Sequence, residues 1–168
     1  MKRGEMEMFR KMRRFGQQLS HEACEEILQR ATSGVLAVSG DDGYPYAVPL
    51  SYVYRDGRLY FHCAVEGHKL DAIRRSDKAS FCVIDQDEVV PERYTTHYRS
   101  VIAFGRVRIL EGDEKHQSIE WLADRYAPGE TERGRQEAEN AWNRLCMLEM
   151  RVEHMTGKQA IELTQKNG

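Results

Sequence analysis

The residues with the clearest chemistry are Gly67, His68 and Lys69, which follow a strand-like run and open a helix-like one. The aromatic run that begins at Tyr60 predicts a strand, and the spacing of Leu70 and the residues after it predicts a helix. The start of a helix carries unpaired backbone N–H groups and a partial positive charge, so it attracts phosphate. Imidazole and ammonium donors would strengthen that attraction. The stretch predicts a phosphate-binding turn, with an ordinary solvated first turn as the alternative.

Length and composition limit the classes of protein to consider. The 168 residues predict a single domain, and 40% apolar with 31% charged residues is typical of a folded globular chain. A net charge of −2 gives no reason to expect nucleic acid as a partner. No apolar run approaches the ~20 residues of a membrane span, and no apolar segment follows the basic N-terminus as in a secretory signal. We therefore expect a cytoplasmic protein without a membrane or nucleic-acid partner.

The four cysteines are scattered and form no CxxC pair, which predicts reduced and mostly buried thiols. Cys63 stands apart because it lies close to the predicted phosphate turn. It is interpreted either as a redox thiol or as a packing residue, and packing is favoured because no resolving cysteine is adjacent. His21, Glu22 and Cys24 on one surface helix would make a poor metal site, so no metal is predicted.

Hydrophobic patterns predict short strands between helices. Ser20 is typical of a helix N-cap, and we expect that helix to run to about Ala31. The other helices are expected at about residues 68–76, 112–126 and 131–143. The strands are expected at residues 35–38, 46–54, 60–64, 79–85, 98–110 and 145–153. Residues 86–96 are interpreted as a long connection.

Three local signals refine this outline. Asp56-Gly57 between two strand-like runs predicts a tight hairpin. Pro49 lacks a backbone donor, so it should lie at a bulge or on an edge strand. Gly105 in the middle of a strand predicts a bend or bulge of the kind that closes a barrel.

Six strand candidates without strand–helix–strand alternation predict a mainly β protein with flanking helices, built as a six-stranded antiparallel closed barrel. A sandwich is the main alternative. Such a barrel is too narrow for a large ligand, so a cofactor would bind on its outer wall or at a subunit interface. We expect an N-terminal arm over residues 1–19, the domain over 20–160 and a C-terminal tail over 161–168.

Three ordered motifs resemble the flavin-binding split-barrel proteins of the pyridoxamine 5'-phosphate oxidase-like family, most closely the nitroimidazole-resistance (nitroimidazole reductase-like) branch. They are residues 42–52 (DGYPYAVPLSY), residues 59–64 with 67–69 (LYFHCA and GHK), and residues 98–105 (YRSVIAFG). The ending at residues 155–158 (MTGK) is similar as well. Residues 15–18 (FGQQ) depart from the branch, and no role for residues 1–19 follows.

The resemblance implies a six-stranded antiparallel split β-barrel, with an FMN at the interface of a homodimer. It implies that Val48, Pro49, Leu50, Ser51 and Tyr52 lie against the isoalloxazine ring, that His62, Cys63 and Ala64 line the ribityl and phosphate side, that His68 and Lys69 bind the phosphate, and that Arg99 and Ser100 come from the partner subunit. Trp142 is interpreted either as a cap on the flavin of the neighbouring subunit or as a residue buried against its own barrel.

Two functions are consistent with these residues. The first is an FMN-dependent oxidoreductase that takes electrons from NAD(P)H and passes them to a small flat acceptor such as a nitroaromatic or a quinone. No side chain stands out as an acid or base, so the catalytic residues are unknown, and no motif for a second phosphate favours a pyridoxamine-phosphate substrate. The second is a non-enzymatic flavin- or haem-binding module, with His62, His68 or His97 as an axial ligand.

Overall fold

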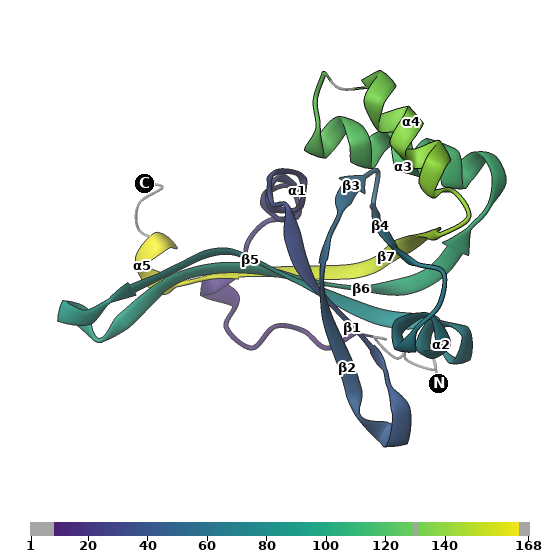
Figure 1. Cartoon of the computed structure of the whole chain (residues 1–168). Coiled ribbons are helices and arrows are strands. Elements are labelled where there is room, and N and C mark those ends of the chain that lie inside the picture. Colours follow the sequence, from purple (N-terminus) through teal and green to yellow (C-terminus); the bar gives the residue numbers. More distant parts are fainter. Residues whose placement is uncertain (1–8, 130, 165–168) are drawn as a thin grey trace, which may run out of the picture.

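The computed structural model of this chain describes residues 9–129 and 131–164 as one curved antiparallel sheet with helices packed against it (Figure 1). The strands are β1 (Ser33–Ser39), β2 (Pro45–Ser51), β3 (Val53–Arg55), β4 (Arg58–Ala64), β5 (Lys78–Val90), β6 (Thr95–Leu110) and β7 (Leu145–Gln159). The helices are α1 (His21–Arg30), α2 (His68–Arg75), α3 (Gly112–Tyr126), α4 (Thr131–Ala141) and α5 (Ile161–Thr164), with 3-10 turns at Phe15–Gln17, Asp41–Gly43 and Pro91–Arg93.

The strands follow the order β2-β1-β5-β6-β7-β4-β3, with antiparallel pairing throughout. The two edge strands β2 and β3 are consecutive in the chain, and in the described residues they form no ladder with each other, so the sheet stays open. The prediction of a mainly β fold with flanking helices is therefore confirmed. The predicted count of six strands and the predicted closure are wrong, because the expected strand over residues 46–54 divides at Tyr52.

Tyr52 leaves the sheet because its groups are bound elsewhere. Its side chain is fully buried, with its ring centroid 4.9 Å from that of Phe81 in an edge-to-face arrangement, and its hydroxyl donates to the carbonyl of Leu28 at 2.8 Å. Its backbone N–H donates to the hydroxyl of Tyr126 at 2.9 Å, and its carbonyl oxygen lies 2.7 Å from that same hydroxyl. The helix residue thus satisfies the backbone groups that a continuous strand would have paired.

The local signals in the sequence correspond to local structure. The hydroxyl of Ser20 accepts from the N–H of Ala23 and caps α1. Asp56 and Gly57 have φ angles of 47° and 75° and form the two-residue β3–β4 turn. Pro49 lies on the edge strand β2, and the ladder between β6 and β7 shifts its register at Gly105. A Cβ at Gly105 would lie 2.0 Å from the carbonyl oxygen of Arg151, so the bulge requires glycine.

Residues 86–96 are not the long connection that was expected. Ladder pairs between β5 and β6 continue to Val90 and Thr95, and the turn Pro91–Arg93 joins the two strands. Tyr94 adopts the left-handed conformation, with a φ of 49°, to complete the turn. Figure 1 shows that this hairpin projects from the body of the molecule, on the side away from α2, α3 and α4. The β-branched residues Val89, Val90, Thr95 and Thr96 favour strand pairing, although polar residues flank them.

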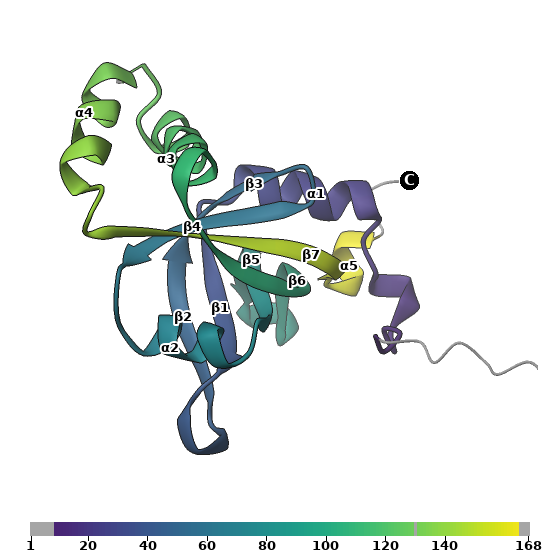
Figure 2. The ribbon, with the colours of Figure 1, turned by 90° about the vertical axis from the view of Figure 1, so that its right-hand side faces the viewer.

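The sheet has apolar layers on both of its faces. The main core lies inside the curve, where α1 adds Ile27 and Leu28 and α2 adds Leu70 and Ile73. A second cluster joins α3 to the outer face of β4 and β7 around Met147. Figure 2 shows α3 and α4 on one side of β4 and β7, with α2 on the other side beside β1 and β2. Within the described residues, no helix is long and apolar enough to cross a membrane.

We expect Tyr126→Phe to lower the free energy of unfolding by about 1–3 kcal/mol, because it leaves the N–H of Tyr52 without a partner. Denaturant unfolding followed by fluorescence would measure the change. Tyr44→Phe is the matched control, since Tyr44 is 75% exposed. Equal stability of the two variants would show that the Tyr126 hydroxyl does not hold the β2–β3 break.

Candidate functional site

The predicted phosphate turn lies where β4 ends and α2 begins. Gly67 has φ 128° and ψ 169°, a conformation that glycine adopts without strain, and it occupies the N-cap position. Its carbonyl accepts from the N–H groups of Leu70 and Asp71 at 3.0 and 3.2 Å. The N–H groups of His68 and Lys69 therefore remain at the open end of the helix, as the geometry of a helix start requires. This end can receive an anion.

The imidazole of His68 is held against the β1–β2 hairpin. Its ring centroid lies 4.2 Å from that of Tyr46, and its Nε2 lies 3.4 Å from a carboxylate oxygen of Asp41. The Nε2 atom is nevertheless buried, and it forms no hydrogen bond of good geometry with a described residue. A Cβ at Gly40 would lie 2.6 Å from the carbonyl oxygen of Tyr44, so the close approach within the β1–β2 hairpin requires glycine. Sequence reasoning missed Tyr46 and Asp41, because only the folded hairpin brings them to His68.

The charges around the turn leave Lys69 available. Asp41 is paired with Arg75 at 2.7 Å, and Asp71 with Arg74 at 3.3 Å. Within the described part of the chain, Lys69 forms no hydrogen bond and no ion pair. An open helix start, the ammonium group of Lys69 and a buried imidazole nitrogen without a well-formed hydrogen bond together fit a phosphate group such as that of FMN.

The five residues expected against the isoalloxazine ring do not all face the same way. Pro49 and Ser51 are exposed on β2, whereas Val48 and Leu50 pack against the main core. Tyr52 is buried, and both of its backbone groups contact Tyr126. Because β2 contacts β4, the outward positions Pro49 and Ser51 lie on an edge strand near the turn. A flat ligand on this strand would meet these two residues first.

The three residues expected along the ribityl chain alternate across β4. His62 and Ala64 are exposed, while Cys63 is half-buried and packs against the main core. Burial raises the pKa of the Cys63 thiol to about 11, although the positive charge of Lys69 acts in the opposite direction. Cys63 is paired directly with Cys146 on β7. No second cysteine is adjacent to Cys63 in the sequence, but the fold places Cys146 next to it, so the expectation that Cys63 lacks a neighbouring cysteine is wrong.

Arg99 and Ser100 lie on β6, which β5 and β1 separate from β2. The Nε of Arg99 is buried and has no hydrogen-bond partner among the described residues, and its Nη1 lies 3.7 Å from Asp85. Asp85 already accepts two hydrogen bonds from Arg30, at 2.8 and 2.6 Å. One copy of the chain does not bring this arginine to α2. The prediction that Arg99 and Ser100 reach the cofactor of a second copy stays a prediction.

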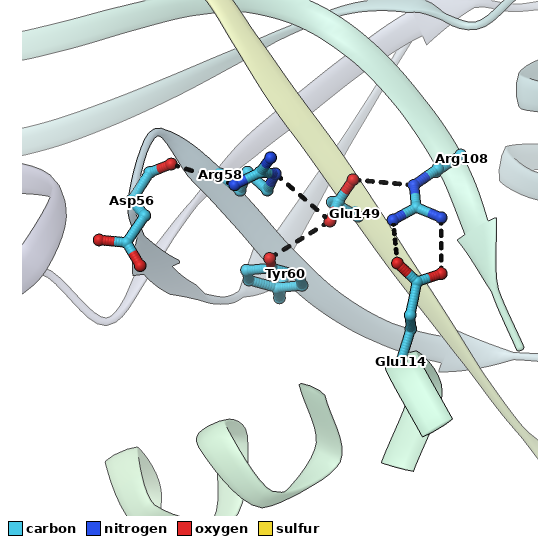
Figure 3. A network of polar contacts seen from close by, with 6 residues as sticks. All are labelled: Asp56, Arg58, Tyr60, Arg108, Glu114 and Glu149. Carbon is cyan, nitrogen blue, oxygen red and sulfur yellow. Dashed lines mark hydrogen bonds and ion pairs between the residues drawn. The ribbon is translucent and has the colours of Figure 1, made fainter. Parts of the chain in front are cut away.

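A separate charged network lies on the outer face of β4, β7 and β6 (Figure 3). Buried Glu149 accepts from Arg108 at 2.8 Å and from the hydroxyl of Tyr60 at 3.2 Å, and Arg58 lies 3.7 Å away. Burial, together with this carboxylate, raises the pKa of Tyr60 to about 12. Arg108 also binds Glu114 at the start of α3 through two hydrogen bonds. We interpret this paired network as the fastening of α3 to the sheet.

Trp142 belongs to the same side of the molecule as α3. Its indole packs on the second apolar cluster, and the ammonium group of Lys115 lies 4.2 Å from its ring centroid. The same ammonium group donates to the carbonyl of Trp142 at 2.8 Å. Of its two interpretations, burial against its own subunit agrees with these contacts.

Comparison with known proteins places this fold and turn in a family. Residues 20–159 match the family described as pyridoxamine 5'-phosphate oxidase. The chain belongs to this family. The resemblance inferred from the three motifs is therefore confirmed, and the match covers the whole sheet, α2 and the turn before it. No curated protein matches the chain.

Solved structures share the fold at low sequence identity. A candidate 5-nitroimidazole antibiotic resistance protein from Bacteroides thetaiotaomicron has a TM-score of 0.71 at 20% identity, over 84% of this chain and 86% of the other. An FAD-binding protein from Mesorhizobium loti has a TM-score of 0.59 at 25% identity, over 85% and 96% of the two chains. An FAD- and haem-binding protein from Mycobacterium smegmatis has a TM-score of 0.74 at 22% identity, over 90% and 80%.

Proposed function

We propose that this chain is a flavoprotein that binds FMN between two copies of itself and acts as an oxidoreductase. The observation that carries the proposal is the anion site at the start of α2. There the buried Nε2 of His68 forms no hydrogen bond of good geometry, although Asp41 lies 3.4 Å away, and Lys69 follows it in the first turn of the helix. Membership of a pyridoxamine 5'-phosphate oxidase family supports a flavin as the phosphate-bearing ligand.

The residues of this chain would bind and orient the cofactor. His68 and Lys69 would hold the phosphate together with the N–H groups at the start of α2, while His62 and Ala64 would lie along the ribityl chain. Pro49 and Ser51 would support the ring from the edge strand. Bound in this way, the flavin would supply hydride and electron transfer. Within the described residues we identify no side chain that must act as an acid or base, so the protein's part is positioning.

FMN is favoured over FAD by the size of the anchor. The turn offers one compact set of donors, which suits the single phosphate group of FMN. The Mesorhizobium loti and Mycobacterium smegmatis neighbours bind FAD, so the fold also accepts the larger flavin. Titration with both flavins distinguishes the two, because FMN should bind this chain at least as tightly as FAD does.

We expect the double substitution His68→Ala with Lys69→Ala to weaken FMN binding more than tenfold. Two charge-assisted hydrogen bonds at ~1.5–3 kcal/mol each would be lost. Flavin fluorescence titration would measure the affinity. Binding of riboflavin, which lacks the phosphate, should change little in the same variant.

Lys78→Ala is the matched control, because it removes an exposed lysine at the start of β5, beyond the C-terminal end of α2 and away from the anion-binding N-terminus. It should leave the affinity for FMN unchanged. Unaltered FMN binding in the double variant would mean that the phosphate lies elsewhere. Equal losses for FMN and riboflavin would point to a damaged fold instead of a lost anchor.

An exposed apolar face supports the homodimer. Pro49, Val35, Cys82 and Ile102 occupy directly paired positions across β2, β1, β5 and β6. Val35 and Ile102 are 38% and 40% exposed, and Phe104 further along β6 is 37% exposed. Apolar side chains that line up across four strands are typical of a surface that another protein covers. A second copy on this face would bring its Ser100, which shares the outward side of β6 with Ile102, to the interface, with Arg99 as the next residue along the strand.

We expect Ile102→Asp to weaken self-association at least tenfold, because a carboxylate would replace an apolar group in the interface. Sedimentation velocity over a range of protein concentrations would measure the change. Gln136→Asp on α4 is the control, since it adds the same charge to an exposed position outside this face. A wild-type protein that stays monomeric at every concentration would contradict the dimer.

Oxidoreductase activity has its own test. The FMN-loaded protein should oxidise NADH or NADPH faster when a nitroaromatic compound or a quinone is added, and the absorbance of the reduced nicotinamide follows the reaction. The same protein stripped of FMN is the control and should be inactive. Tight FMN binding without any nicotinamide oxidation would leave a flavin-binding module and exclude the proposed electron donor.

A haem-binding module is the second candidate function, because the imidazole of His97 has a nitrogen that could serve as an axial ligand. The Nε2 of His97 is buried without a hydrogen-bond partner in the described residues, and its Nδ1 lies 3.8 Å from Glu88. A neighbour of this fold binds both FAD and haem. The absorbance spectrum of the purified protein separates the candidates: flavin bands support FMN, and a Soret band supports haem.

A further inference from the structure

The two cysteines Cys63 and Cys146 face each other across neighbouring strands. Cys63 on β4 and Cys146 on β7 are direct partners in the antiparallel ladder, and both side chains belong to the main core. Opposed Cα atoms in such a ladder lie about 4.5–5.5 Å apart, within the range that a disulfide spans. The other two cysteines, Cys24 and Cys82, have no cysteine as a ladder partner. The fold therefore creates one cysteine pair.

The surroundings of the pair give small molecules access to it. Cys63 is half-buried, and Cys146, although 7% exposed, lines a cleft with a volume of about 280 Å³. Val65 and Arg74 border this cleft on the α2 side, and Trp142 borders it on the opposite side. Cys146 lies close enough to Cys63 to be among the groups that raise the pKa of its thiol. Both sulfur atoms can thus meet a small oxidant without unfolding.

We propose that Cys63 and Cys146 are a reversible dithiol–disulfide pair that a peroxide oxidises. This activity goes beyond flavin binding, because its chemistry needs no cofactor. Disulfides in reducing compartments are usually transient and redox-sensing, which suits a pair that opens and closes. No sequence pattern indicates the pair, since the two residues are distant along the chain.

The chemistry balances with hydrogen peroxide as the oxidant. The Cys63 thiolate attacks one peroxide oxygen, so an S–O bond forms, the O–O bond breaks, and hydroxide leaves to become water. The sulfur of Cys146 then attacks the sulfur of Cys63, so the S–S bond forms, the S–O bond breaks, and a second water leaves. Two thiols and one peroxide thus give one disulfide and two waters. A small dithiol reductant reverses the change by thiol–disulfide exchange.

The protonation of Cys63 sets the rate of the first step. Burial is the largest cause that raises its pKa to about 11, so little thiolate exists at neutral pH. Lys69 acts against burial and favours the thiolate. Oxidation should therefore accelerate as the pH rises toward 11, and Lys69→Ala should slow it at neutral pH, where the lysine is charged.

The test uses the full chain treated with equimolar hydrogen peroxide. Denatured wild-type protein should titrate with four thiols before treatment and with half of them afterwards. Tryptic digestion without reductant should give one new species in which residues 59–69 and residues 145–151 are joined. Treatment with dithiothreitol should restore all four thiols, and the oxidised protein should unfold at a higher temperature because the crosslink restricts the unfolded chain.

Two control variants keep the proposal falsifiable. Cys63→Ser should abolish the joined peptide, and the double substitution Cys24→Ser with Cys82→Ser should retain it. An unchanged thiol count in the wild-type protein would overturn the proposal. Oxygen added to single cysteines, or a disulfide formed through Cys82, would also overturn it. Peptide mapping of the wild-type protein decides the question even where a serine variant fails to fold.

Discussion

The open sheet depends on the contact between Tyr52 and the hydroxyl of Tyr126. A continuous strand over residues 46–54 would have joined the neighbours of β2 to those of β4 and closed the barrel. Instead the backbone N–H of Tyr52 donates to a helix residue, and its side chain enters the core. The chain bends there, β2 remains an edge strand, and Pro49, which has no N–H, occupies that edge without loss of a ladder bond. One hydroxyl thus separates two strands and leaves an open surface beside the anion turn.

The parts of the fold that the sequence predicts are those whose signals are local. Ser20 caps its helix, Asp56-Gly57 turns its hairpin, and Gly105 bends its strand because each acts on its own neighbours in the chain. The break at Tyr52 depends on Tyr126, whose side chain arrives from α3, and no local pattern contains that information. The prediction of a long connection over residues 86–96 was wrong for another reason. Polar residues beside β-branched ones permit both a loop and an exposed strand, such as the β5–β6 hairpin.

In the candidate site, too, the sequence predicts local features, and the contacts between distant segments come from folding. The glycine, histidine and lysine of the turn are consecutive, so their chemistry is visible in the sequence. The His68 ring packs on Tyr46 and lies beside Asp41, two residues of a hairpin that only folding brings close. Cys146 lies opposite Cys63 for a similar reason, since a ladder between β4 and β7 joins distant segments. Residue types can therefore be read from the chain, whereas partners come from the topology.

Lys69 connects the two chemistries inferred at this end of β4. Its positive charge lowers the pKa of Cys63 against the effect of burial, and the same charge is available to a phosphate at the start of α2. An anion bound to Lys69 would offset this charge and so raise the pKa of Cys63 further. Because linkage is reciprocal, formation of the Cys63 thiolate would equally disfavour the bound anion. A filled anion site thus protects the thiol pair, and an empty one exposes it to oxidation.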